Sequence, residues 1–438
     1  MRSKDELKQA VCEAIDLERD RIFMLGDSIA ADPELGYKEF NTAAKFIEFL
    51  EWLGLSYRSG IARTGVISKS KGRKSILNVA LMAELDAIIV PGHPDANPLT
   101  GAVHACGHNC MMAALAGVAI AMKNSGALRE LDGDITLMAV PAEEFIEIEF
   151  RKALRQSGEI WFFGGKQEFI KLGELDDVDM MIMQHSSSSD SQYRAGAAAP
   201  SNGFIAKLVR YVGKKAHAGA SPHEGINALN AALIGITAIN AQRETFRDDD
   251  HIRVHPIITR GGDLVNIVPA DVRLETYVRG SSVDAIMDAS KKVDRALLAG
   301  GDAVGARTEI TDVTGYLPAL LNENLINLMY DNLKVLLGGR NAATRICSGL
   351  GGGSSDQGDV SQIMPSLQAF FNCISGGLHT EEYVITDKEL AYITPAKALS
   401  MLLIDILYDG ARTGLEIKES FKPSMSISEY LSNWGSLG

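Results

Sequence analysis

The segment His104-Ala105-Cys106-Gly107-His108-Asn109 places one thiol and two imidazoles within five residues. Cysteine supplies a soft thiolate and histidine a neutral nitrogen, and both suit Zn²⁺ and other transition metals. The glycine allows a tight backbone, so that these side chains can converge on one ion. Taken alone, the pattern also fits a Cys-Gly turn before a helix with surface histidines, because short motifs arise readily by chance.

Glu143 and Glu144 form a second feature, directly after the apolar run Ile135–Val140. Adjacent carboxylates repel each other, and a nearby cation makes it less costly to keep both charged. One carboxylate can then bind a metal while the other serves as general base toward water. Taken alone, the pair is better explained as two exposed acids at the start of a helix, where they suit the helix dipole.

Two further histidines each follow an apolar run. His185 comes after Val178–Gln184, and His379 lies in a loop after Leu367–Phe371. Either one alone is more typical of a structural histidine than of a ligand. Together with the two features above, they place four polar clusters after predicted strands, which is hard to obtain by chance.

Glu84 and Asp86 follow another apolar run, Ile76–Met82, and lie two residues apart on one face of an extended segment. Asp86 could orient a liganding histidine from outside the coordination shell. Solvation of the strand end is the alternative role for both residues.

The middle of the chain contributes three more candidates. His217, in a loop after a predicted strand, could polarise a substrate carbonyl. Asn266, before Pro269, and Arg279, at a strand end, could hold a carboxylate, for which arginine is the best-shaped side chain. Local sequence alone would leave all three as surface residues.

The order of apolar runs and helical patterns predicts the elements that position these residues. Residues 4–29 and 41–53 have helical spacing, and short buried strands alternate with helices, which is typical of a layered α/β domain. Sites in such folds lie at the carboxyl ends of the strands. Residues 418–438 are rich in serine and suggest a loose tail.

The middle region changes to alternating patterns, in the order strand, helix, strand, strand, helix, strand, which predicts a ferredoxin-like α+β insert. We therefore expect an α/β fold whose central mixed sheet, flanked by helices, belongs to a split catalytic domain at 1–196 and 313–438. The insert spans 197–312, and Gly196–Ala199 is the expected hinge. The glycine-rich run Gly349–Asp356 lacks the Gly-Lys-Ser/Thr ending of a phosphate-binding P-loop and is better suited to line a pocket.

Composition narrows the function classes. The chain has 438 residues, of which 46% are hydrophobic and 23% charged, and a net charge of −13, which argues against non-specific nucleic-acid binding. No apolar stretch follows the first residues, so we expect no secretion signal, a cytoplasmic location and reduced cysteines. The longest apolar run, Cys110–Met122, is shorter than a membrane span, so we expect no membrane partner.

Taken in order, these motifs resemble the aminoacylase / glutamate carboxypeptidase family of dinuclear metallohydrolases. The set comprises the Cys106 and Glu143 motifs, His185, His217-Ala-Gly-Ala-Ser-Pro through Gly225-Ile-Asn-Ala, Gly261-Gly262, Asn266-Ile-Val-Pro269 and His379. Asp32-Pro-Glu-Leu-Gly36 is similar to the branch of hippurate hydrolase, indole-acetyl-amino-acid hydrolase and the p-aminobenzoyl-glutamate hydrolases. The resemblance covers residues from about 10 to 405.

The resemblance implies a role for each candidate. It implies two divalent ions, zinc or manganese, bound by the five ligands Cys106, His108, Glu144, His185 and His379. Glu143 would be the general acid and base, and Asn266 and Arg279 would contact the substrate. His217, on the insert, would reach the active site of the neighbouring subunit in a homodimer.

The sequence departs from that branch around the substrate rather than at the ligands. Met82-Ala-Glu84-Leu-Asp86-Ala replaces the usual Arg-Ala-Asp-Met-Asp-Ala, and Phe145-Ile146-Glu147 follows the double glutamate in place of glycines. We expect hydrolysis of the amide C–N bond of an N-acyl amino acid, with an aromatic acyl group among the candidates, or of a dipeptide. The substrate would be a small molecule bearing a carboxylate. The alternatives are hydrolytic deamination of an aromatic amino acid and a non-catalytic protein that binds amino-acid conjugates.

Overall fold

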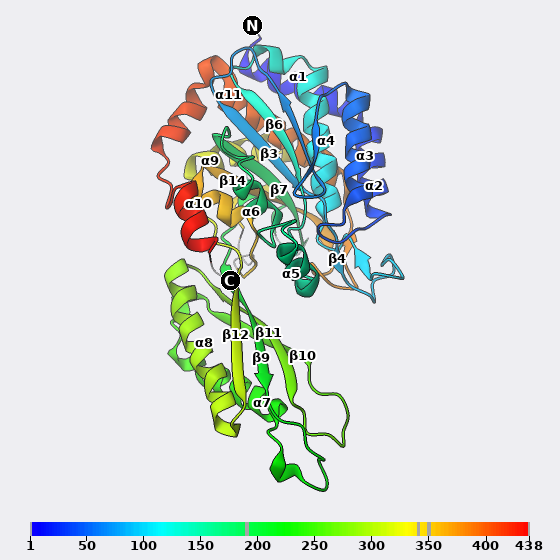
Figure 1. Cartoon of the computed structure of the whole chain (residues 1–438). Coiled ribbons are helices and arrows are strands. Elements are labelled where there is room, and N and C mark those ends of the chain that lie inside the picture. Colours follow the sequence, from blue (N-terminus) through cyan, green and yellow to red (C-terminus); the bar gives the residue numbers. More distant parts are fainter. Residues whose placement is uncertain (1, 189–191, 340–341, 348–351, 437–438) are drawn as a thin grey trace. The chain divides into compact units, whose positions relative to one another are not determined.

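The chain folds as two compact units, seen in a computed structural model that describes residues 2–188, 192–339, 342–347 and 352–436 (Figure 1). The first unit comprises Met1–Pro200, Leu320–Leu350 and Asp359–Ile427. The second comprises Ser201–Ala319, Gly351–Gly358 and Ser428–Gly438. The boundaries between the two units thus lie a few residues after the predicted domain boundaries at 196 and 312. The end of the chain, Ser428–Gly438, belongs to the same unit as the insert.

A mixed sheet of nine strands, as far as the described residues define it, forms the centre of the first unit. The order is β1-β2-β6-β3-β7-β14-β8-β13, with β15 beside β14. The strands are β1 (Arg58–Ile61), β2 (Gly65–Ser70), β3 (Asn78–Glu84), β6 (Asp134–Val140), β7 (Met180–Ser188), β8 (Ala195–Ala198), β13 (Ala343–Ile346), β14 (Ser366–Ser375) and β15 (Val384–Ile385). A separate ribbon pairs β4 (Ile88–Ile89) with β5 (Ala102–Val103).

Four neighbouring strands of this sheet run in the same direction. β6 pairs parallel with β3, β3 with β7, and β7 with β14. Every residue of β3 and β6 is buried, as expected of strands covered on both faces. The predicted apolar strands are therefore confirmed, and their carboxyl ends meet at one edge of the sheet.

Helices of the first unit pack on this sheet and on one another. They are α1 (Lys4–Leu17), α2 (Arg19–Ala30), α3 (Phe40–Leu53), α4 (His108–Asn124), α5 (Ile148–Gln156), α6 (Gly165–Lys171), α9 (Glu323–Leu337), α10 (Gln357–Ile363) and α11 (Thr394–Ser420). α2, α3 and α4 lie side by side in Figure 1 and contact one another. α4 also contacts β3, β6 and β7, and so begins beside the carboxyl ends of the strands.

The single helix predicted over residues 4–29 is wrong, because the chain breaks at Glu18. Its φ of −110° ends α1, and α2 begins at Arg19. The second predicted helix is confirmed as α3, which ends at Gly54 with a φ of 68°. That left-handed conformation is readily adopted by glycine, which has no Cβ.

Two other predictions need correction. The expected hinge, Gly196–Ala199, lies largely in β8 (Ala195–Ala198), which is fully buried and hydrogen-bonded to β13 and β14. The end of the chain, expected as a loose tail, includes the short helix α12 (Ile427–Glu429) and the buried Tyr430 and Trp434. Trp434 donates its indole N–H to the Gly315 carbonyl at 3.1 Å. Of the glycine-rich run at 349–356, residues 349–351 lie outside the described part of the chain.

The second unit has the predicted order of elements. β9 (Gly203–Val212), α7 (Ala228–Ala241), β10 (Arg253–Arg260), β11 (Asp271–Gly280), α8 (Val283–Val304) and β12 (Arg307–Thr314) follow one another. The antiparallel sheet has the order β10-β11-β9-β12, which is ferredoxin-like. Both helices pack on one face, around a core that includes Val209, Leu274 and Val293.

Helix α11 is long and apolar. Among the described residues, the stretch Glu389–Ser420 has the length and composition to cross a membrane, but 89% of its most apolar window is buried inside the fold. The backbone leaves helical geometry at Tyr408–Ala411, which kinks the helix. α11 contacts α1, α4 and α9, so its apolar character is accounted for by packing.

Substituting Leu402 by alanine should destabilise the first unit, because this α11 side chain is fully buried and its loss leaves a cavity. We expect a loss of about 2–5 kcal/mol, measured by urea unfolding monitored by circular dichroism. Leu17→Ala on α1 is the matched control, since Leu17 is 85% exposed and its loss should change stability by less than about 0.5 kcal/mol. Equal effects of the two substitutions would contradict the packing of α11.

Candidate active site

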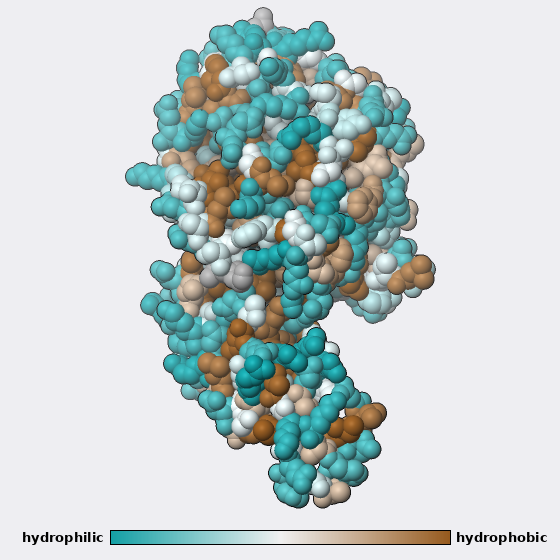
Figure 2. All heavy atoms as spheres, viewed as in Figure 1, coloured by the Kyte–Doolittle hydropathy of each residue, from teal (hydrophilic) through white to brown (hydrophobic). Residues whose placement is uncertain are grey.

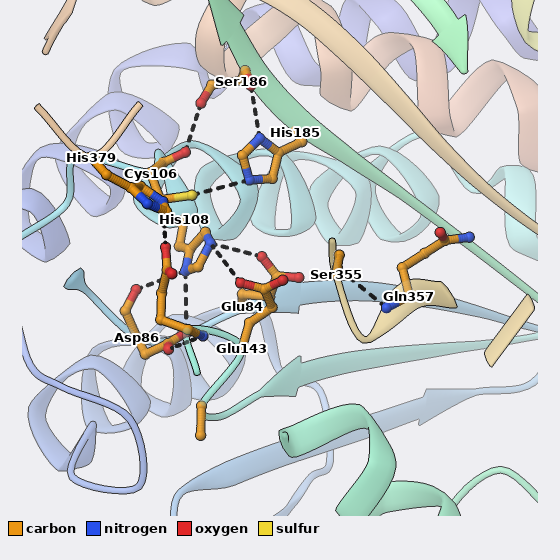
Figure 3. A network of polar contacts seen from close by, with 12 residues as sticks. Glu84, Asp86, Cys106, His108, Glu143, His185, Ser186, Ser355, Gln357 and His379 are labelled. Atoms are coloured by element: carbon orange, nitrogen blue, oxygen red, sulfur yellow. Dashed lines mark hydrogen bonds and ion pairs between the residues drawn. The ribbon is translucent and has the colours of Figure 1, made fainter. Parts of the chain in front are cut away.

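The carboxyl ends of the four parallel strands carry most of the candidate residues. Glu84 is the last residue of β3, and Glu143 and Glu144 follow β6 directly. His185 lies within β7 rather than after it, and His379 lies in the loop after β14. Figure 3 shows the side chains of Glu84, Glu143, His185 and His379 gathered in one place.

Cys106 and His108 reach the same edge from the loop before α4. His108 is the first residue of α4, and Gly107 before it has a φ of 90°. A Cβ at Gly107 would lie 2.1 Å from Ser186 Oγ, so this position requires glycine both for its conformation and for the approach of β7. The tight turn lets two side chains from adjacent positions face the strand ends.

Potential ligand atoms gather in two groups that share Cys106. One group is Cys106, His108 and His185, and the other is Cys106, Glu144 and His379. Cys106 Sγ lies 3.4 Å from His185 Nε2, and His379 Nε2 lies 2.9 Å from Glu144 Oε1. The structure thus brings together, from separate elements, all five residues predicted as metal ligands.

Both His108 and His185 use Nδ1 for contacts with the protein and turn Nε2 toward the cluster. His108 Nδ1 lies 2.8 Å from the Asp86 carbonyl and 3.1 Å from Asp86 Oδ1. His185 Nδ1 donates to the Ser186 carbonyl at 2.7 Å. With one proton held on Nδ1, Nε2 is the ring atom available to a metal, which would displace any proton there. Asp86 therefore lies where the sequence analysis expected it.

The site also contains two residues that sequence reasoning did not assign to it. Glu84 Oε2 lies 2.9 Å from His108 Nε2, and the other Glu84 oxygen is paired with the Lys166 ammonium. All three side chains are fully buried. Glu84, His108 and Glu143 form a third group of potential ligand atoms. Only the position of Glu84 at a strand end hinted at its placement, and no local signal marked Lys166.

The loop that carries the double glutamate is held at three backbone atoms. The Glu39 carboxylate accepts from the Ala142 amide at 2.8 Å, and Asp86 Oδ2 accepts from the Glu144 amide at 2.9 Å. The buried Arg151 guanidinium, from α5, donates to the Glu144 carbonyl at 2.5 Å. Ala142 has a φ of 55°, a strained conformation for a residue with a Cβ, and these contacts maintain it.

Opposite charges shift the pKa values of the clustered groups. Burial and the Glu144 charge raise the pKa of the Cys106 thiol. The charges of His185, His108 and His379 lower it by more, so that the net pKa is about 6. Burial raises the pKa of the Glu144 carboxyl, but the His379 charge lowers it by more, so that the net pKa is about 2. Burial lowers the pKa of His379, while Glu144 and Cys106 raise it to about 11. The charges of the cluster therefore favour a thiolate and ionised carboxylates, which bind metals, together with protonated imidazoles, whose protons a bound cation would displace.

His104, although adjacent in sequence, does not join these groups. It is buried, and among the described residues neither ring nitrogen has a hydrogen-bond partner. Burial, together with the His108 charge, lowers its pKa to about 3, so the ring is neutral.

The remaining candidates lie in the second unit. His217 is exposed, and its Nδ1 accepts from the amides of Gly219 and Ala220 at 3.2 and 3.0 Å. The exposed Asn266 is close by, because its carbonyl accepts from the Ala218 amide at 2.9 Å. Arg279 is half-buried beside the rings of Phe204 and Tyr277 and donates to Ser354 Oγ at 2.7 Å.

The first-unit cluster fits divalent metal ions. One thiolate, imidazoles and carboxylates form a mixed sulfur, nitrogen and oxygen donor set. His108 Nε2, Glu144 Oε1 and Glu84 Oε2 are all buried and have no hydrogen-bond partner among the described residues. Buried polar atoms left without such partners are costly, and a bound cation would satisfy them.

Comparisons with known proteins agree with this geometry. The mouse protein named Xaa-Arg dipeptidase is 28% identical over 97% of this chain and 94% of its own length. The N-acyl-L-amino acid amidohydrolase of Geobacillus stearothermophilus is 27% identical over 73% of this chain and 81% of its own.

Solved structures share the fold at lower identity. A dinuclear metal-binding peptidase of the M20 family from Bacillus subtilis has a TM-score of 0.64 at 20% identity, and covers 90% of this chain and 99% of its own. The aminobenzoyl-glutamate utilization protein from Klebsiella pneumoniae has a TM-score of 0.67 at 16% identity, over 90% and 98%.

The family profile covers both the strand ends and the insert. The profile described as peptidase family M20/M25/M40 matches residues 80–396, which include every candidate residue of both units. With the ligand cluster and the similarity to dipeptidases and amidohydrolases, this match identifies a metal-dependent hydrolase of amide or peptide bonds. The chain belongs to peptidase family M20/M25/M40.

Proposed function

We propose that the protein hydrolyses the amide C–N bond of a dipeptide or an N-acyl amino acid with two divalent ions per subunit. The observation that carries this proposal is the pair of ligand groups that share the Cys106 thiolate. His108 and His185 would complete one site, and Glu144 and His379 the other. Cysteine and histidine favour Zn²⁺, while the carboxylates also suit Mn²⁺. A reduced Cys106 is consistent with a cytoplasmic location.

Glu143 is the proposed general base. Its carboxylate is buried and lies 3.9 Å from His108 Nε2, at the edge of the ligand groups without belonging to either Cys106 group. Bound divalent ions would supply Lewis acidity toward the attacking water and the amide carbonyl. Glu143 would accept a proton from that water and deliver it to the leaving nitrogen. Asp86 would keep His108 in the tautomer that leaves Nε2 free.

His217 is the proposed stabiliser of the oxyanion. Because its Nδ1 accepts from two backbone amides, the neutral ring carries its proton on Nε2, which makes that atom a hydrogen-bond donor. A donor aimed at the developing negative charge lowers the barrier to attack. We propose that each His217 serves the active site of the other subunit in a homodimer.

Exposed apolar side chains in the second unit support that dimer. Ile257 lies on β10, an edge strand of the described sheet, and Leu264 and Val265 follow it in the next loop. All three are exposed, and Figure 2 shows hydrophobic patches among hydrophilic residues on this unit. An edge strand with exposed apolar residues is suited to pair with a second copy.

Arg279 and Asn266 are the proposed contacts for a substrate carboxylate. The Arg279 guanidinium is held by Ser354 and by the faces of two aromatic rings, which limits its rotamers. A pre-oriented guanidinium binds a carboxylate at lower entropic cost than a mobile one. Dipeptides with a C-terminal arginine are the first substrates to test, because the full-length relative is named Xaa-Arg dipeptidase.

Replacing Glu143 by glutamine should distinguish the proposed general base, Glu143, from the proposed metal ligand, Glu144. The change removes the proton acceptor but keeps the shape, so we expect kcat to fall by about 10²–10⁴-fold with little change in metal content. Glu144→Gln, the matched variant next to it, should lower metal content measured by plasma mass spectrometry. Loss of metal in the Glu143 variant instead would mean that the two roles are exchanged.

Mixing two inactive variants should restore activity if His217 acts across the dimer. His217→Ala and Glu143→Gln should each be poorly active alone. A mixed dimer has one site in which both residues are intact, so co-refolded protein should recover up to about half of the wild-type activity per mixed dimer. If mixed dimers form, as shown by differently tagged chains, and no activity returns, His217 does not act in trans.

The carboxylate requirement can be tested with paired substrates. We expect Xaa-Arg dipeptides or N-acyl amino acids to be cleaved, and their C-terminal amides to show a KM at least about 10-fold higher, since a charge-assisted contact is lost. Arg279→Gln should remove most of this difference while kcat changes little. Release of ammonia from an aromatic amino acid, without cleavage of any amide, would favour the deamination alternative.

A further inference from the structure

Glu84 has a position that its roles in the fold do not explain. It ends β3 and is fully buried, with one carboxylate oxygen on Lys166 and the other facing His108. Figure 3 shows its carboxylate beside that of Glu143, next to the His108 ring, while Asp86 lies on the other side of that ring. A strand-end residue with a merely structural role would not require a charged group at this depth.

Lys166 compensates the charge of Glu84. It lies on α6, is fully buried, and contacts Glu84 Oε1. Burying an ion pair is rarely favourable for stability compared with apolar side chains of similar size. A buried pair beside a ligand cluster therefore points to function, in which Lys166 keeps Glu84 ionised.

Glu84 and His108 face each other as a buried ion pair. The two atoms are 2.9 Å apart, yet neither Glu84 Oε2 nor His108 Nε2 has a hydrogen-bond partner among the described residues. Asp86 already occupies His108 Nδ1, so Nε2 is the ring atom that faces Glu84. A buried anionic oxygen and a buried imidazole nitrogen at this separation are placed as two ligands of one cation, which would take the position of the imidazole proton.

The distance agrees with this description. Ligand atoms bound to one ion at about 2.0–2.2 Å lie about 2.8–3.5 Å from each other at octahedral or tetrahedral angles. The 2.9 Å separation of Glu84 Oε2 and His108 Nε2 falls in that range. Glu84 approaches His108 from the side of Glu143, since these three residues form one group of potential ligand atoms.

We propose that Glu84 is a ligand of the ion bound by His108, through Oε2, while Lys166 holds Oε1. The inference rests on the metal centre of the proposed function and adds a donor to it. An anionic oxygen makes this ion's surroundings harder and raises its coordination number, which favours Mn²⁺ and Co²⁺ relative to a site of cysteine and histidine alone.

Titration with Co²⁺ tests the proposal without relying on activity. The metal-free full-length protein is titrated while the visible d–d absorption is recorded, because the intensity of these bands rises as the coordination number falls. For Glu84→Gln, which keeps the size and loses the charge, we expect stronger bands for the His108 site. We also expect its Kd to rise by more than about 100-fold, the upper limit for loss of an outer-shell partner.

Glu168→Gln is the matched control. Glu168 is also buried and lies on α6 near Lys166, but its carboxylate accepts from the amides of Trp161 and Phe162. We expect wild-type spectra and affinities for this variant. An effect equal to that of Glu84→Gln would overturn the proposal, because it would reflect general disruption of the region.

The outcomes separate the inference from the proposed function. If the wild-type protein binds no Co²⁺, the metal centre itself is wrong. If the wild type binds Co²⁺ and Glu84→Gln has the same spectrum and Kd, Glu84 is not a ligand although the centre stands. Should Glu84→Gln fail to fold, Glu84→Asp keeps the charge against Lys166 but shortens the reach. Weaker binding with altered bands then supports ligation, and an unchanged spectrum overturns it.

Discussion

The carboxylate of Asp86 connects the two halves of the candidate active site. One oxygen contacts His108 Nδ1, which fixes the tautomer of that ring, and the other accepts from the Glu144 amide, which fixes the loop after β6. The histidine and the double glutamate therefore cannot move independently. This buried carboxylate therefore helps to set the distance between His108 and Glu144, two of the potential ligands. The parallel pairing of β3 with β6 makes the contact possible.

Much of this site could be predicted from sequence because its residues follow apolar strands. Glu144 and His379 lie in loops after parallel strands and His185 lies near the end of one, so these residues meet at one edge of the sheet. Cys106 and His108 were marked by their own motif before α4. Glu84 and Lys166 could not be paired in this way. Their contact joins β3 to α6 across an intervening segment, and no periodicity or motif encodes a pairing over 82 residues of chain. Arg151 was missed for the same reason.

The fold was predictable where hydrophobic patterns were long and ambiguous where composition was the only signal. The ferredoxin-like insert followed from alternating strands and two amphipathic helices. Small residues at 195–198 suggested flexibility, yet alanine and glycine also allow the close approach of neighbouring strands, and a Cβ at Gly196 would lie 2.1 Å from Cys347 Sγ. Serine-rich composition hid the buried aromatic rings of Tyr430 and Trp434. Tertiary packing, rather than local preference, decided both segments.

The hydrogen bond from Arg151 to the Glu144 carbonyl connects the short helix α5 to the candidate active site. Its guanidinium also donates to the Phe163 carbonyl and lies over the ring of Tyr37. Arg151 therefore ties α5 to the loop of the double glutamate and to two other segments. Local opening of α5 would release the Glu144 backbone without unfolding the sheet. Metal uptake and the docking of α5 are therefore linked equilibria, and bound ions would slow amide hydrogen exchange in a helix that contributes none of their ligands.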